Sequence, residues 1–118
     1  MKLREAINDI KTGVVHPVYF LKGNDHFLQN FLIDELAKEI FDNQSENRIL
    51  MLPDEMSGKE IVDRLTNMDL FSERKLFILR DPQKLKGKAS SDLISLCENS
   101  IDNHFIVLIN DDYIAKTA

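Results

Sequence analysis

The sequence predicts an α/β fold, a doubly wound parallel sheet with flanking helices. Three observations support this fold class. Four short apolar runs alternate with segments of helical periodicity. Each run is followed within two residues by Gly, Pro, Asn or Asp, as strands often are. Runs that are apolar at every position need cover on both faces of the sheet, which helices between the strands provide.

The elements follow in chain order. Leu3 to Ile10 has apolar residues at helical spacing and is stopped by Gly13, and the first strand, 18–21, follows Pro17. Residues 27–40 carry an apolar stripe typical of an amphipathic helix. The remaining predicted elements are a strand over 48–52, a helix from the Ser57–Glu60 capping box, a strand over 76–79, a helix favoured by Asp92 at its amino end, and a strand over 105–109.

Length and composition bound the function. The 118 residues predict one domain, 1–118, and the net charge of -5 is unusual for a domain that holds phosphate backbones. The single Cys97 allows no internal disulfide and lies on an apolar stripe, which favours the core. With no signal peptide and no apolar run of about 20 residues, we expect a cytoplasmic protein without a membrane segment. The histidines are dispersed, so no metal site is predicted.

The first strand-to-helix turn lacks the residues of a phosphate loop. That loop needs G-x-x-x-x-G-K-[ST], because glycines free the backbone N–H groups, lysine neutralises charge and the hydroxyl binds magnesium. Counting from Gly23, Leu28 replaces the second glycine, Gln29 the lysine and Asn30 the Ser/Thr. Each change removes a separate requirement, so we expect no nucleotide hydrolysis and no cofactor at this loop.

Other candidate sites are weaker. Asp81, after the third strand, has the position of a magnesium ligand but is better explained as the start of a turn at Pro82. The Gly58-Lys59 and Gly87-Lys88 pairs do not form phosphate loops, because Pro53 and Pro82 stand five residues before the two glycines, where the first glycine of the loop belongs. We expect Lys59 on a helix face and Lys88 on a surface loop.

The connection before the third strand is unusually apolar. Met68 to Arg74 (MDLFSER) places Leu70 and Phe71 side by side where polar turn residues are typical. The two side chains either fold back into the core, as apolar residues beyond a helix end do, or protrude as a wedge for a partner's apolar pocket. The residues alone leave both interpretations open.

Three segments resemble the amino-terminal domain of the delta subunit of the bacterial DNA polymerase III clamp loader. They are PVYFLKGNDHFLQNFL from Pro17, MDLFSERKLFILRDPQKLKGK from Met68, and HFIVLIND from His104. The resemblance implies an AAA+-like module that does not bind ATP, contacts the sliding clamp (the beta subunit) and helps to open the ring, while other subunits hydrolyse ATP. It also implies that Leu70 and Phe71 anchor the clamp, with Met68 as an accessory contact.

The resemblance carries further expectations. The partners are the sliding clamp and the other clamp-loader subunits, and DNA is contacted only through the complex. The domain itself is not an enzyme, although the holoenzyme has DNA-directed DNA polymerase activity. AAA+ modules have a fifth strand beside the first, so we expect this chain to be the first part of a longer subunit. Asn110, at the position of a phosphate sensor, is expected to be a turn residue.

Two alternatives belong to other classes. One is a divergent P-loop nucleotide-binding protein or NTPase of the same architecture. The other is a receiver-type regulatory domain, which needs an acidic cluster at the ends of the first and third strands. The end of the first strand offers Asp25, which is poorly placed for that role.

Overall fold

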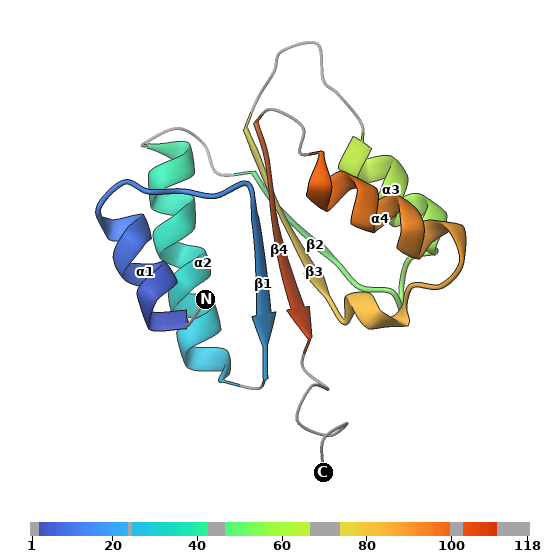
Figure 1. Ribbon diagram of the computed structural model, residues 1–118, viewed down its shortest axis with the longest axis horizontal. Coiled ribbons are helices and arrows are strands. Elements are labelled where there is room, and N and C mark those ends of the chain that lie inside the picture. Colours follow the sequence, from blue (N-terminus) through green and yellow to red (C-terminus); the bar gives the residue numbers. More distant parts are fainter. Residues whose placement is uncertain (1–2, 24, 43–46, 67–73, 100–102, 111–118) are drawn as a thin grey trace.

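Four strands form one all-parallel sheet in the order β1-β4-β3-β2 in the computed structural model, which describes residues 3–23, 25–42, 47–66, 74–99 and 103–110. The elements are α1 (Leu3–Lys11), β1 (Val18–Lys22), α2 (His26–Phe41), β2 (Arg48–Met51), α3 (Gly58–Thr66), β3 (Lys75–Arg80), the short 3-10 helix η1 (Pro82–Lys84), α4 (Lys88–Glu98) and β4 (His104–Asn110). Figure 1 shows the sheet between two pairs of helices.

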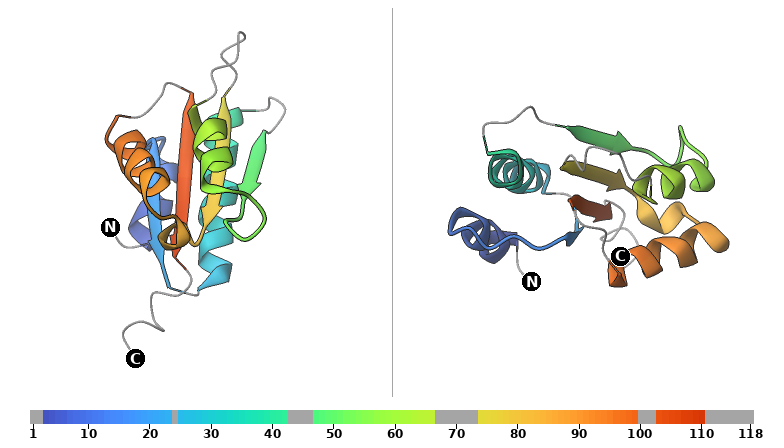
Figure 2. Two further views of the ribbon diagram at one scale, coloured as in Figure 1. Left: turned by 90° about the vertical axis from the view of Figure 1, so that its right-hand side faces the viewer. Right: turned by 90° about the horizontal axis from the view of Figure 1, so that it is seen from above.

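The helices cover the sheet from both sides. Helices α1 and α2 lie on one face and α3 and α4 on the other, as two views show (Figures 1 and 2). Successive side chains of a strand point to opposite faces. On β3, Leu76 and Ile78 therefore join the apolar cluster under α1 and α2, whereas Phe77 and Leu79 join the cluster under α3 and α4. The predicted doubly wound α/β fold is confirmed.

The two edge strands depart from the prediction that every strand is covered on both faces. Phe20 of β1 and Leu50 of β2 are 49% and 57% exposed. Each outer strand is buried on one face only: Tyr19 and Leu21 of β1 join the cluster under α1 and α2, and Met51 of β2 joins the cluster under α3 and α4. An apolar run therefore predicts a strand here, but it does not tell an inner strand from an edge strand.

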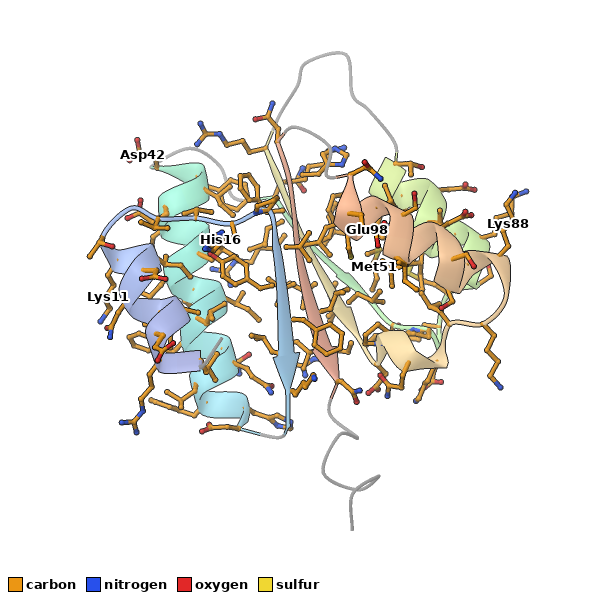
Figure 3. All side chains as sticks on the ribbon, in the orientation of Figure 1. Lys11, His16, Asp42, Met51, Lys88 and Glu98 are labelled. Carbon is orange, nitrogen blue, oxygen red and sulfur yellow. The ribbon has the colours of Figure 1, made fainter. Side chains whose placement is uncertain are left out.

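The helix starts follow local hydrogen bonding. The N–H of Glu60 donates to the Ser57 hydroxyl at 3.1 Å, which confirms the predicted cap of α3. Helix α4 begins at Lys88, well before Asp92, because Gly87 adopts a positive φ of 63° that lets the chain enter the helix without a side-chain cap. The prediction that Lys88 lies on a loop is wrong. Figure 3 shows its side chain extending away from the sheet, whereas Met51 points into the packed side chains.

Helices α3 and α4 approach each other closely at their first residues. A Cβ atom at position 58 would lie 2.7 Å from the Cβ of Ala89, closer than such atoms approach in proteins. Glycine at 58 therefore allows this packing, and the apolar cluster between these helices and the sheet depends on it.

Replacing Gly58 by alanine should lower the free energy of unfolding by about 1–3 kcal/mol, because the added methyl group pushes the two helices apart. Urea denaturation measures the loss. Adding Ala89→Gly to the variant should restore part of the stability, since it removes the opposing methyl group. Equal losses from Gly58→Ala with and without Ala89→Gly would contradict this explanation.

Candidate functional site

The carboxyl ends of β1 and β4 form the topological switch point of the sheet. From β1 the chain passes over one face to β2, whereas the later connections return over the other face. Ligands of parallel α/β sheets bind at such a point. The turn that starts at Gly23 and the first turn of α2 lie here, and the Gln29 side chain contacts the Gly23 carbonyl.

Two backbone N–H groups of this turn, those of Gly23 and Leu28, have acceptors within the chain. The N–H of Gly23 donates to the carbonyl oxygen of Asn110 at 3.1 Å, which joins the ends of β1 and β4. The N–H of Leu28 donates to the Asp25 carboxylate at 3.1 Å. Asp25 thus caps α2 and places a negative charge where a phosphate would approach a helix amino end. Sequence reasoning missed this role, although an Asp just before a helical stripe is a recognised signal.

Gln29 closes the turn from inside. The side chain is 1% exposed, and its Nε2 donates to the carbonyl oxygen of Gly23 at 3.0 Å. Its Oε1 is buried and has no hydrogen-bond partner among the described residues. Leu28 is half-buried against the cluster under α1 and α2, and Asn30 is exposed on α2. The residue in the lysine position therefore ties the loop to its own helix.

Asp81 begins a turn, as expected from Pro82. It has a positive φ of 56°, its N–H donates to the carbonyl oxygen of Ile109 at 2.7 Å, and its carboxylate accepts from the Gln83 amide at 3.2 Å. In the part of the chain that the structure describes, no three His, Cys, Asp or Glu side chains gather as metal ligands.

The second candidate region is the connection between α3 and β3. Met68, Leu70 and Phe71 lie outside the described residues, so their exposure stays a prediction. The two stems are described: α3 ends at Thr66, and Arg74 leads into β3. They lie at the amino ends of the strands, because helix-to-strand turns of a parallel α/β sheet lie opposite its strand-to-helix turns. The Gly23 turn therefore lies at the opposite end of the strands, where their carboxyl ends meet.

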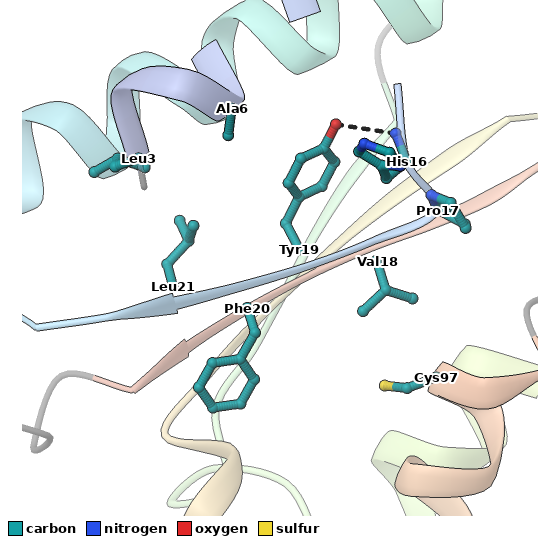
Figure 4. Close-up of a pocket in the computed structure, with 9 residues that line it drawn as sticks. All are labelled: Leu3, Ala6, His16, Pro17, Val18, Tyr19, Phe20, Leu21 and Cys97. Carbon is teal, nitrogen blue, oxygen red and sulfur yellow. Dashed lines mark hydrogen bonds between the residues drawn. The ribbon is translucent and has the colours of Figure 1, made fainter. Parts of the chain in front are cut away.

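A hollow follows the outer edge of β1. It has a volume of about 450 Å³ and wraps around the strand, with Tyr19 and Leu21 facing α1 and Phe20 and Val18 facing α4 (Figure 4). No other described strand pairs with this edge. Cys97 lies at the hollow, half-buried against the cluster under α3 and α4, so its predicted core position is confirmed in part. Burial, aided by the charge of Glu98, raises the pKa of its thiol.

Comparison with known proteins shows the family to which this chain belongs. Residues 19–116 match the family model described as DNA polymerase III, delta subunit. The chain belongs to the DNA polymerase III delta subunit family. The match includes both the closed turn at Gly23 and the connection between α3 and β3.

A solved delta structure has the same fold. The Bacillus subtilis DNA clamp loader delta protein superposes with a TM-score of 0.73 at 20% identity, over 93% of this chain and 36% of that one. The chain therefore spans about a third of that delta protein. The search of curated proteins found no match. The resemblance to the delta subunit family and the α/β fold predicted from the sequence are confirmed. In the described residues, no helix is long and apolar enough to span a bilayer.

Proposed function

We propose that this delta-family domain acts in DNA replication as the clamp-binding module of a clamp loader, and that it helps to open the sliding clamp without hydrolysing ATP. The observation that carries the proposal is the family match over residues 19–116. The partners are the sliding clamp and the other clamp-loader subunits, and DNA is reached through the complex.

The clamp contact is assigned to the connection between α3 and β3. Leu70 and Phe71 are the anchors, because large apolar side chains buried in a partner's pocket supply most of an interface's binding free energy. Met68 adds an adaptable contact. The connection is the most apolar turn of the chain, and both of its stems contact the Asn103-His104 segment at the start of β4.

The geometry of the Gly23 turn supports a domain without its own ATP site. The N–H groups of Gly23 and Leu28 already have acceptors within the chain, and the Asp25 carboxylate opposes a second anion. Gln29 supplies no positive charge. A nucleotide would have to break these contacts before binding.

Differential binding gives the mechanism. A wedge that fits the clamp better when one interface of the ring is open shifts the clamp toward the open state by the difference in binding free energy. ATP acts elsewhere in the assembly, where it exposes or hides this surface.

The proposal is tested by surface plasmon resonance of the chain over immobilised cognate clamp, with and without ATP and magnesium. We expect saturable binding whose affinity does not depend on the nucleotide. Absence of binding overturns the clamp assignment. Saturable ATP binding by calorimetry would instead favour a divergent P-loop protein.

A further inference from the structure

Both stems of the connection between α3 and β3 are held by residues from distant parts of the chain. His104, the first residue of β4, is 5% exposed, and its Nδ1 lies 2.9 Å from the carbonyl oxygen of Leu65 in the last turn of α3. On the other stem, Arg74 Nη1 donates to the carbonyl oxygen of Ile40 at 2.6 Å. The N–H of Lys75 donates to the carbonyl oxygen of Asn103 at 2.9 Å.

The contact with the Leu65 carbonyl determines which ring nitrogen of His104 carries a proton. A carbonyl oxygen only accepts hydrogen bonds, so Nδ1 of His104 must carry the proton and donate. Carbonyl groups in the last turn of a helix have no partner within the helix. His104 therefore supplies a donor to the end of α3 just before the chain leaves it.

The ring of His104 is itself fixed. It packs edge-on against Phe77 of β3, with ring centroids 5.3 Å apart. Asn103 adopts a positive φ of 67°, which side chains other than Asn, Asp and Gly rarely accept, as the chain turns into β4. One short segment, Asn103-His104, thus holds the last turn of α3 through a side chain and the first residue of β3 through the backbone.

We propose that His104 is a positioning residue for clamp binding. By holding the Leu65 carbonyl it fixes the direction in which the chain leaves α3, and so how residues 67–73 are presented to the clamp. The inference rests on the proposed function. Arg74 serves the second stem in the same way, by joining the entry of β3 to the last turn of α2.

Two variants of His104 separate the donor from the volume of the side chain. His104→Leu keeps an apolar side chain in the buried site but removes the donor, whereas His104→Asn keeps an N–H at the position of Nδ1. We expect His104→Leu to lower clamp affinity on the order of fivefold to tenfold, and His104→Asn to restore part of it. The matched control is Ile33→Val, a mildly destabilising change in the cluster under α1 and α2. It should leave affinity unchanged at a temperature where every variant is folded.

A double-mutant cycle gives a readout that a merely structural role would not move. Clamp affinity is measured for His104→Leu, for Leu70→Ala and for both together on the full chain. If His104 acts through the wedge, its effect should fall to twofold or less once Leu70 is truncated, because little wedge contact is left to misplace. An equal loss in both backgrounds overturns the positioning role and leaves a structural one.

The remaining outcomes separate the two proposals. Wild-type affinity in His104→Leu, together with a large loss in Leu70→Ala, overturns the positioning role while the clamp assignment stands. If the wild-type chain does not bind the clamp, or if Leu70→Ala binds as well as wild type, the assignment of the wedge fails and the inference fails with it.

Discussion

The double substitution Leu70→Ala/Phe71→Ala should lower the affinity of the chain for the sliding clamp by roughly 10²- to 10⁴-fold. Burial of each large apolar side chain in a pocket is worth about 1.5–3 kcal/mol. Both together are worth about 3–6 kcal/mol, and about 1.4 kcal/mol corresponds to a tenfold change in affinity. Surface plasmon resonance over the immobilised clamp measures the loss. Met68→Ala should have a smaller effect in the same direction.

The same variant distinguishes the wedge from the core interpretation. If Leu70 and Phe71 protrude, the urea midpoint of the double variant should match wild type, whereas two core side chains would cost several kcal/mol. The matched control is Phe27→Ala, which removes a ring that is 76% exposed on α2 at the other edge of the sheet. Unchanged clamp affinity in the double variant, or a loss of equal size in Phe27→Ala, would sink the wedge assignment.

Restoring the lysine of a phosphate loop by Gln29→Lys should destabilise the fold by about 3 kcal/mol and fail to create an ATP site. The Gln29 side chain is buried and tied to the Gly23 carbonyl, so a lysine there places an ammonium group in a buried site that now holds a neutral amide. The second glycine and the Ser/Thr are still missing, and the Leu28 N–H still donates to Asp25. Urea denaturation and calorimetry with ATP and magnesium provide the two measurements.

The pH dependence of stability distinguishes charge burial from poor packing in the Gln29→Lys variant. Burial lowers the pKa of a lysine in the folded state below its unfolded value, which is near 10.4. The loss in free energy of unfolding is therefore complete below the folded pKa, and it shrinks as the pH rises toward the unfolded pKa. The loss of stability should therefore be smaller at about pH 9.5 than at pH 7. Gln29→Met, which has no charge, is the control and should show no such trend. A pH-independent loss in Gln29→Lys, or saturable ATP binding, would contradict the explanation.

The sequence predicts the type of each element because the signals are local. The Ser57 cap, the stripe of α2 and the Gly13 stop each involve neighbours in the chain. The start of α4 was placed too late because Gly87 begins the helix through backbone conformation, without a capping side chain. The exposure of Phe20 and Leu50 was missed because the order of the strands is set by pairing between distant segments.

For the candidate site, too, local motifs could be predicted from the sequence, whereas the contacts that replace them could not. A missing phosphate-loop residue is visible in a local motif, so Leu28, Gln29 and Asn30 were found from spacing. The bond from Gln29 to Gly23 was not predicted, because a missing motif does not say what replaces it. His104 was set aside as a dispersed histidine. Its partner Leu65 is 39 positions away, and no periodic pattern relates the two residues.

The two turns at opposite edges of the sheet have a mechanical consequence for the proposed function. The six residues of β3 span about 20 Å between those edges, at about 3.3 Å per residue. If no nucleotide binds at the Gly23 turn, the domain supplies no ATP-driven motion of its own to the clamp contact. The free energy that favours the open ring would then come from the clamp contact alone, as the difference in its affinity for the open and the closed clamp. ATP in the neighbouring subunits would control when this domain contacts the clamp.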